Sequence, residues 1–304
     1  MKVRVLGSAA GGGFPQWNCN CRNCDGLRRG RIRARPRTQS SIAVSADGRS
    51  WILFDASPDI LTQLLAFPEA QPARAIRDTA IVGIVLTDSQ VDHTTGLLML
   101  REGSPLKVYC TDSVHDDLST ANPIFGILGH YCGVEWRRLH ARDTASFHVE
   151  GADGLSLSAV PLLSKAPPYS SHRHDPHQGD TLGLQVTDDA TGRTMFYAPG
   201  LGRIEPHLRI ILERSDCLLV DGTFWSDGEM IDLDIGDKRA HDMGHLPQSG
   251  QGGMIEVLAG YPRARKILIH INNTNPILDE DSPERAQLAS AGIEVAHDGM
   301  DFVV

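Results

Sequence analysis

The sequence lacks any apolar run that approaches the roughly 20 residues needed to span a bilayer. The apolar stretch within residues 1–13 is too short for a secretory signal, so we expect a strand that enters a Gly-rich loop. Positive charge is not in excess, because the formal net charge is -9, which argues against nucleic acid and anionic membranes as partners. No low-complexity linker divides the chain. We therefore expect a cytoplasmic protein without membrane insertion, folded as a single domain over residues 1–304.

What is present predicts a two-sheet architecture. The 304 residues are 41% hydrophobic, which is enough for a sizeable core. Asp47-Gly48 between the apolar segments 40–46 and 51–56 is a strong hairpin signal. Elsewhere buried strands alternate with helices, and both halves begin with antiparallel strands. We predict an α/β (α+β) fold, a four-layer αββα sandwich; a doubly wound parallel sheet is the alternative, and the hairpins argue against it.

Cysteines are clustered at Cys19, Cys21 and Cys24. Three thiolates at this spacing can surround one tetrahedral ion, usually Zn²⁺, whereas a disulfide is disfavoured by the odd number and by a reducing compartment. We predict a structural zinc loop over about residues 18–25.

Acidic and imidazole side chains end several apolar strands, where α/β folds place their chemistry. The segment that begins Thr87-Asp88 and ends Asp92-His93 resembles the metallo-β-lactamase superfamily signature, strand-T-H-x-H-x-D-H-x-x-G-L. Asp88 and Gln90 stand where its two leading histidines would be. Alone, Asp92-His93 would be read as a helix-capping Asp beside a surface His.

The resemblance implies further site residues. Asp92 and His93 match the second metal site, Asp221 looks like the bridging carboxylate, and His270 looks like the last ligand. Two imidazoles and two carboxylates suit non-haem Fe²⁺, although Mn or Zn could also bind, and make ordinary hydrolysis less favoured. Related phosphodiesterases hold the zinc of the cysteine loop with a His at the position of Asn273, so that ligand does not carry over. Candidates for other roles are Asp88 and His177 as extra ligands or proton acceptors, His245 for proton transfer, and His245, His297 or an acidic side chain as the fourth zinc ligand.

Arginines crowd the segment 28–37, which is read either as a solvated basic loop or as an anion clamp. Arg35, Arg37 and Arg173 are candidates for binding substrate carboxylates.

Longer runs at 7–13, 14–19, 35–41, 172–177 and 270–276 resemble a family of pyrroloquinoline quinone (PQQ) biosynthesis proteins within the superfamily. That resemblance implies an iron-dependent oxygenase (a non-haem hydroxylase) acting on the tyrosine ring of the Glu-Tyr-derived PQQ precursor. The alternatives are a carrier in transport of PQQ or its precursor to the periplasm, and a residual metal-dependent hydrolase. Other PQQ-pathway proteins are expected partners, and a homodimer is possible.

Overall fold

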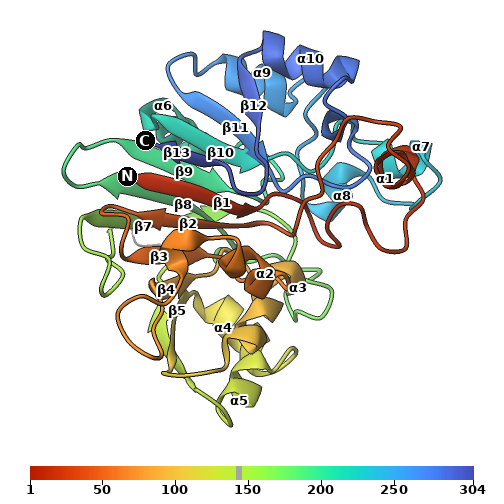
Figure 1. Cartoon of the computed structure of the whole chain (residues 1–304). Helices are drawn as coiled ribbons and strands as arrows, with labels where there is room; N and C mark the ends of the chain where they lie inside the picture. Colours follow the sequence, from red (N-terminus) through yellow and green to blue (C-terminus); the bar gives the residue numbers. More distant parts are fainter. Residues whose placement is uncertain (142–145) are drawn as a thin grey trace.

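The computed structural model describes residues 1–141 and 146–304 and places two β-sheets between two layers of helices (Figure 1). The first sheet has seven strands in the order β13-β1-β2-β3-β4-β5-β6. Its strands are β1 (Lys2–Gly7), β2 (Ser41–Ser45), β3 (Trp51–Phe54), β4 (Ile81–Val85), β5 (Leu106–Cys110), β6 (Val134–Arg138) and β13 (Asp301–Val303). The second sheet has six strands in the order β12-β11-β10-β9-β8-β7. Its strands are β7 (Leu155–Leu162), β8 (Thr181–Asp188), β9 (Thr194–Ala198), β10 (Cys217–Asp221), β11 (Arg265–Ile269) and β12 (Ile293–Val295).

Each sheet changes from antiparallel to parallel pairing in the middle. Strands β1, β2 and β3 pair antiparallel, and β3 to β6 pair parallel. Likewise β7, β8 and β9 are antiparallel, and β9 to β12 are parallel. The predicted hairpin joins β2 and β3, and its turn is closed by Asp47 Oδ1, which accepts from Arg49 N at 2.7 Å. The alternation of hairpins and parallel crossovers is the pattern that predicted two sheets.

Three apolar cores separate the four layers. One lies between the sheets and joins residues such as Val44 and Phe54 of the first to Leu184 and Leu219 of the second. Another packs the second sheet against α6 (Pro206–Arg214), α9 (Met254–Ala259) and α10 (Pro283–Ser290). The third packs the first sheet against α2 (Ile60–Leu65), α4 (Asp112–Ser119) and α5 (Ile124–Leu128). The prediction of a four-layer αββα sandwich is therefore confirmed.

The helices are short and connect the strands. They are α1 (Arg22–Arg28), α2 (Ile60–Leu65), α3 (Val91–Thr94), α4 (Asp112–Ser119), α5 (Ile124–Leu128), α6 (Pro206–Arg214), α7 (Glu229–Asp232), α8 (Ala240–Met243), α9 (Met254–Ala259) and α10 (Pro283–Ser290), with 3-10 turns at Pro68–Ala70, Thr95–Leu100 and Pro276–Leu278. In residues 1–141 and 146–304, no helix combines the length and apolar character that a membrane span requires.

Gly96 explains why the segment after α3 is a 3-10 turn pressed against its neighbours. A Cβ at this position would overlap the carbonyl oxygen of Ser57 and approach that of Ala56 to 2.7 Å. The Gly96 amide donates to the Ala56 carbonyl at 2.9 Å, which pins the turn beside the end of β3. Only glycine allows this approach, which places α3 at the edge where β3 and β4 end.

Two residues at strand ends adopt left-handed backbone conformations. Asp55 follows β3 with φ 59°, and His270 follows β11 with φ 60°. Residues other than glycine rarely occupy this region, at a cost on the order of 1–2 kcal/mol each. Such conformations persist where the surroundings fix them, and both residues lie at the edge described next.

Candidate metal centres

Asp92, His93 and His270 bring their ligand atoms together at the carboxyl ends of the parallel strands. Asp92 and His93 come from α3, after β4, and His270 directly follows β11 of the other sheet. Asp92 Oδ2 lies 3.3 Å from His270 Nε2 and 3.9 Å from His93 Nε2. The site therefore spans the contact between the two sheets, with two imidazoles and one carboxylate.

Asp88 fixes the orientation of His93. His93 Nδ1 lies 2.9 Å from Asp88 Oδ1, and we assign the proton of this hydrogen bond to Nδ1, as is usual for a histidine backed by a carboxylate. The buried Nε2 atom has no hydrogen-bond partner among the described residues. Asp88 thus contacts the back of the imidazole, and His93 Nε2 is left for a ligand.

Thr223 plays the same part for His270 and was not foreseen. Its hydroxyl donates to Asp221 Oδ1 at 2.6 Å and accepts from His270 Nδ1 at 2.9 Å. His270 Nε2 consequently faces Asp92, 3.3 Å from its Oδ2. The only sequence signal was the position of Thr223, two residues after the acidic end of β10.

Asp221 is enclosed by donors. Its Oδ1 also accepts from Thr223 N at 2.9 Å, and its Oδ2 accepts from Leu201 N at 2.8 Å and from His245 Nδ1 at 2.7 Å. Asp221, His245 and His270 form a second potential ligand group, but hydrogen bonds already link it through Thr223. The group around Asp92 is the one with an unpartnered nitrogen.

The charges of the site are strongly coupled. Burial opposes ionisation of Asp92, but His93 and His270 outweigh it and hold the pKa of Asp92 below its usual range. Burial would lower the pKa of His93 and of His245, yet the neighbouring carboxylates raise both. Asp55, which accepts from Thr87 N at 2.8 Å behind His93, has a pKa raised to about 7 by its burial. Of these two carboxyl groups, Asp92 is the one held in its ionised form beside the imidazoles.

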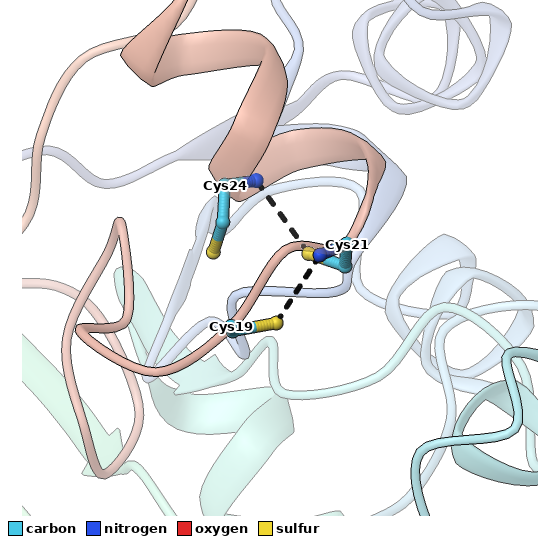
Figure 2. A group of neighbouring side chains, drawn as sticks. All are labelled: Cys19, Cys21 and Cys24. Atoms are coloured by element: carbon cyan, nitrogen blue, oxygen red, sulfur yellow. Dashed lines mark hydrogen bonds between the residues drawn. The ribbon is translucent and has the colours of Figure 1, made fainter.

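The three clustered cysteines form a second group at the start of α1 (Figure 2). Cys19 Sγ accepts from Cys21 N at 3.4 Å, and Cys21 Sγ accepts from Cys24 N at 3.5 Å. Burial disfavours the Cys19 thiolate, but hydrogen bonds from Cys21 N and neighbouring groups lower its pKa overall. Burial raises the pKa of Cys21 to about 12, so binding of a cation there would have to release a proton.

Asn273 fills the fourth side of the cysteine group. Its side-chain amide lies 3.1 Å from Cys19 Sγ, 3.6 Å from Cys21 Sγ and 3.4 Å from Cys24 Sγ. The candidates from sequence lie elsewhere, since His245 is bonded to Asp221, and His297 Nδ1 contacts the Asp298 carbonyl at 3.1 Å. The position at which the relatives' histidine was missing is therefore occupied by an amide that points at all three sulfurs.

A cavity of about 260 Å³ opens in front of the imidazoles. Its lining includes Asp88, Asp92, His93, His245 and His270, together with Lys165 and Arg173. The predicted residues Asp88, Asp92, His93, Arg173, His245 and His270 thus meet at one cavity, with Asp221 buried directly behind it.

Three predicted residues are not part of this cavity. His177 is exposed, and its Nε2 lies 3.2 Å from Asp175 on the surface. Arg35 pairs with Glu280 at 3.3 Å. Arg37 is only 4% exposed and donates to Ser8 Oγ and to the Ala296 carbonyl. These positions correct the expectation that His177 serves the metal and that Arg35 and Arg37 hold substrate.

The rest of the arginine segment is bound to the protein itself. Arg28 donates to the Cys19 carbonyl at 2.5 Å, Arg29 pairs with Asp25 at 2.6 Å, and Arg33 pairs with Glu280 at 2.5 Å. The segment fastens the cysteine loop to the residues before α10 and is not an anion clamp.

Comparison with known proteins agrees with this geometry. Residues 50–271 match the beta-lactamase superfamily domain. Coenzyme PQQ synthesis protein B of Methylobacillus flagellatus is 63% identical, with 100% of each chain covered, and that of Azotobacter vinelandii is 63% identical, with 99% of each covered. The crystal structure of Zn(2+)-bound PqqB from Methylobacterium extorquens superposes with a TM-score of 0.91 at 39% identity over 100% of both chains.

A diphosphatase from the PhnP family shares the fold, with a TM-score of 0.67 at 20% identity over 99% of this chain and 96% of that one. At that identity the likeness concerns architecture alone. The full-length matches above decide the classification: this chain belongs to the coenzyme PQQ synthesis protein B family of the beta-lactamase superfamily.

Proposed function

We propose that this protein acts in PQQ biosynthesis as an iron-dependent hydroxylase of the tyrosine ring of the Glu-Tyr-derived precursor, in the cytoplasm. The observation that supports it is the group of Asp92, His93 and His270, whose ligand atoms converge on the cavity. Two histidines and one carboxylate with open positions are the ligand set of non-haem Fe(II) oxygenases.

The residues fit such an ion. His93 Nε2 is buried without a partner, and His270 Nε2 faces Asp92 because Thr223 occupies its other nitrogen. Asp92 would supply one negative charge, which leaves the centre cationic and able to take further ligands. Bound Fe(II) would supply activation of O₂ for insertion of oxygen into the aromatic ring.

His245 is suited to move the proton of a substrate hydroxyl. Its Nδ1 donates to Asp221 and the residue lines the cavity, so Nε2 is the ring nitrogen left to exchange a proton. Asp221, bonded through both oxygens, holds this imidazole and Thr223 in place. We therefore assign Asp221 and Asp88 to positioning of the histidines, and His245 to proton transfer.

The hydrolase alternative is less well supported, because the residues that replace the leading histidines are engaged elsewhere. Asp88 bonds the rear nitrogen of His93, and Gln90 Nε2 donates to the Lys165 carbonyl at 3.2 Å. A two-metal hydrolytic centre would need both of these positions to supply ligands. The carrier alternative predicts binding of PQQ or precursor without any need for His93.

The test is an anaerobic preparation loaded with Fe(II) and mixed with a cross-linked Glu-Tyr substrate and O₂. We expect a product heavier by oxygen, with incorporation dependent on Fe(II) and lost in His93→Ala. The Thr194→Val variant, on β9 away from the cavity, serves as a control and should retain the reaction. Absence of oxygen insertion together with iron-independent binding of PQQ would refute the hydroxylase and favour the carrier.

For the cysteine loop we propose a structural Zn²⁺ held by Cys19, Cys21, Cys24 and the side chain of Asn273. An amide can present its oxygen in place of its nitrogen by rotation about its last bond, which turns a donor into a ligand. The loop packs beside Asn273, three residues after His270, so zinc there would stabilise the backbone that carries an active-site ligand.

A further inference from the structure

The segment after β7, residues 163–173, contributes Ser164, Lys165, Pro168 and Arg173 to the lining of the cavity; we call it the covering loop. It is fastened to the site at several points. Gln90 Nε2 donates to the Lys165 carbonyl at 3.2 Å, the Tyr169 hydroxyl donates to the Ser89 carbonyl, and Ser164 Oγ donates to the Gly244 carbonyl at 3.0 Å. Gln90 and Ser89 belong to the segment that leads into Asp92 and His93, so the covering loop has a defined position relative to these ligands.

The covering loop carries two cations into the cavity wall. Lys165 and Arg173 are both half-buried and both line the cavity. One nitrogen of Arg173 donates to the Ala166 carbonyl at 2.6 Å, which anchors the guanidinium within its own loop. Among residues 1–141 and 146–304 neither cation forms an ion pair, although Arg35 and Lys107 each pair with a glutamate. Partly desolvated cations without a counter-charge favour an anionic ligand.

Apart from the histidines, the other charged residues at the cavity are acidic, so an acidic substrate needs nearby cations in order to bind. Asp88 and Asp92 also line the cavity, Asp221 is buried behind it, and the chain has a formal net charge of -9. A substrate with several carboxylates would be repelled there at close range in a site of reduced dielectric. Lys165 and Arg173 supply positive charge within this lining, so carboxylates beside them would be stabilised and the uncharged ring would be left toward the imidazoles.

We propose that Lys165 and Arg173 together bind substrate carboxylates and so determine both specificity for an acidic, amino-acid-derived substrate and the orientation of its ring. This inference rests on the proposed function for the identity of the substrate, a Glu-Tyr conjugate, which has two α-carboxylates and one side-chain carboxylate when free. Arg173 can bind one carboxylate with two parallel hydrogen bonds, and Lys165 acts as a point charge. Gln90, in place of a metal-binding histidine, holds the Lys165 backbone in position.

The experiment measures binding separately from turnover. Protein loaded with redox-inactive Zn²⁺ is titrated calorimetrically with the cross-linked Glu-Tyr diamino acid and with its methyl ester, for wild type, Lys165→Met and Arg173→Met. Each variant should bind the acid about 10- to 100-fold more weakly, as expected for loss of a charge-assisted hydrogen bond. The ester should bind wild type weakly and should not distinguish the variants from wild type. Lys165→Arg should recover most of the affinity, and Lys107→Met, at the Glu150 pair on β5, is the matched control.

Two results would overturn the inference: wild type that binds ester as tightly as acid, or variants that bind the acid as tightly as wild type. Hydroxylation by the same proteins with Fe(II) and O₂ is then measured independently. Turnover with an unchanged KM in both variants would refute the carboxylate contacts and leave the hydroxylase intact. Charge-dependent binding without any oxygen insertion would refute the hydroxylase and leave the carboxylate contacts standing.

Discussion

Replacement of Thr223 by Val tests whether the hydrogen bonds behind the imidazoles create the metal site. The hydroxyl joins Asp221 Oδ1 at 2.6 Å to His270 Nδ1 at 2.9 Å, and all three residues are buried. Val keeps the shape of the side chain and removes the hydroxyl, which also contacts His245 Nδ1 at 3.1 Å. Asp221 Oδ1 would retain the Thr223 backbone N–H, whereas His270 Nδ1 would lose its acceptor.

The expected magnitudes follow from that difference. A buried donor without a partner costs about 1–3 kcal/mol of unfolding free energy. Loss of a hydrogen bond that orients a ligating histidine typically lowers metal affinity by about 10- to 100-fold. Because His270 can then rotate or protonate at Nε2, we expect the loss of affinity to exceed the effect on the fold.

The assay is competition for Fe(II) between the protein and a chromophoric chelator under anaerobic conditions, together with urea denaturation of the metal-free protein. Thr223→Ser retains the hydroxyl and should remain close to wild type in both measurements. Thr194 lies on β9, and its hydroxyl donates to the carbonyl of Arg214 at the end of α6. Thr194→Val removes this hydroxyl and should leave Fe(II) affinity unchanged. Equal Fe(II) affinity in Thr223→Val and wild type would refute the reasoning.

Other consequences can be measured in the same way. Gly96→Ala should destabilise the protein by about 1–3 kcal/mol in urea denaturation, because the new Cβ overlaps the Ser57 carbonyl. The control is Gly126→Ala on α5, where a Cβ meets open space and the effect should be neutral or stabilising. An unchanged stability of Gly96→Ala would contradict the packing argument. Asn273→His should retain more zinc than wild type in competition with a chelator, and Asn273→Ala should retain less. Equal zinc content in wild type and both variants would refute the assignment of Asn273 as a zinc ligand. Burial raises the pKa of Glu229 from 4.5 to about 7, so the folded state binds the extra proton between these values and the stability of wild type falls as pH rises through that window. Glu229→Gln cannot titrate, so its stability relative to wild type should increase from pH 5 to pH 8 by on the order of 2–3 kcal/mol, and a difference that is constant with pH would refute the assignment.

Local patterns were sufficient for the fold, whereas the metal-ligand group was predicted from the family resemblance together with the positions of its residues after strands. Buried parallel strands place their carboxyl ends at one edge of a sheet. Residues that directly follow such strands, like His270, or lie a few residues later, like His93, can therefore be predicted from the sequence to lie close together. The hairpin at Asp47-Gly48 was equally readable, because its turn chemistry is contained in a few residues.

Other contacts could not be foreseen because they depend on pairing between distant parts of the chain. Arg35 reads as a free cation until Glu280 is placed beside it, and nothing near Arg37 indicates that it enters the core. Asn273 and Thr223 are neutral residues without a recognised ligand pattern. Their roles come from what faces them, namely three sulfurs in one case and an imidazole in the other.

The division of the ligands between the sheets has a mechanical consequence. Asp92 and His93 follow β4 of the first sheet, and His270 follows β11 of the second. Any relative sliding of the sheets changes the distance between Asp92 and His270 directly. An ion bound by all three residues would therefore act as a cross-link at one end of the sandwich, and fragments cut between the halves would each hold an incomplete site that regains affinity only when the sheets reassemble in register.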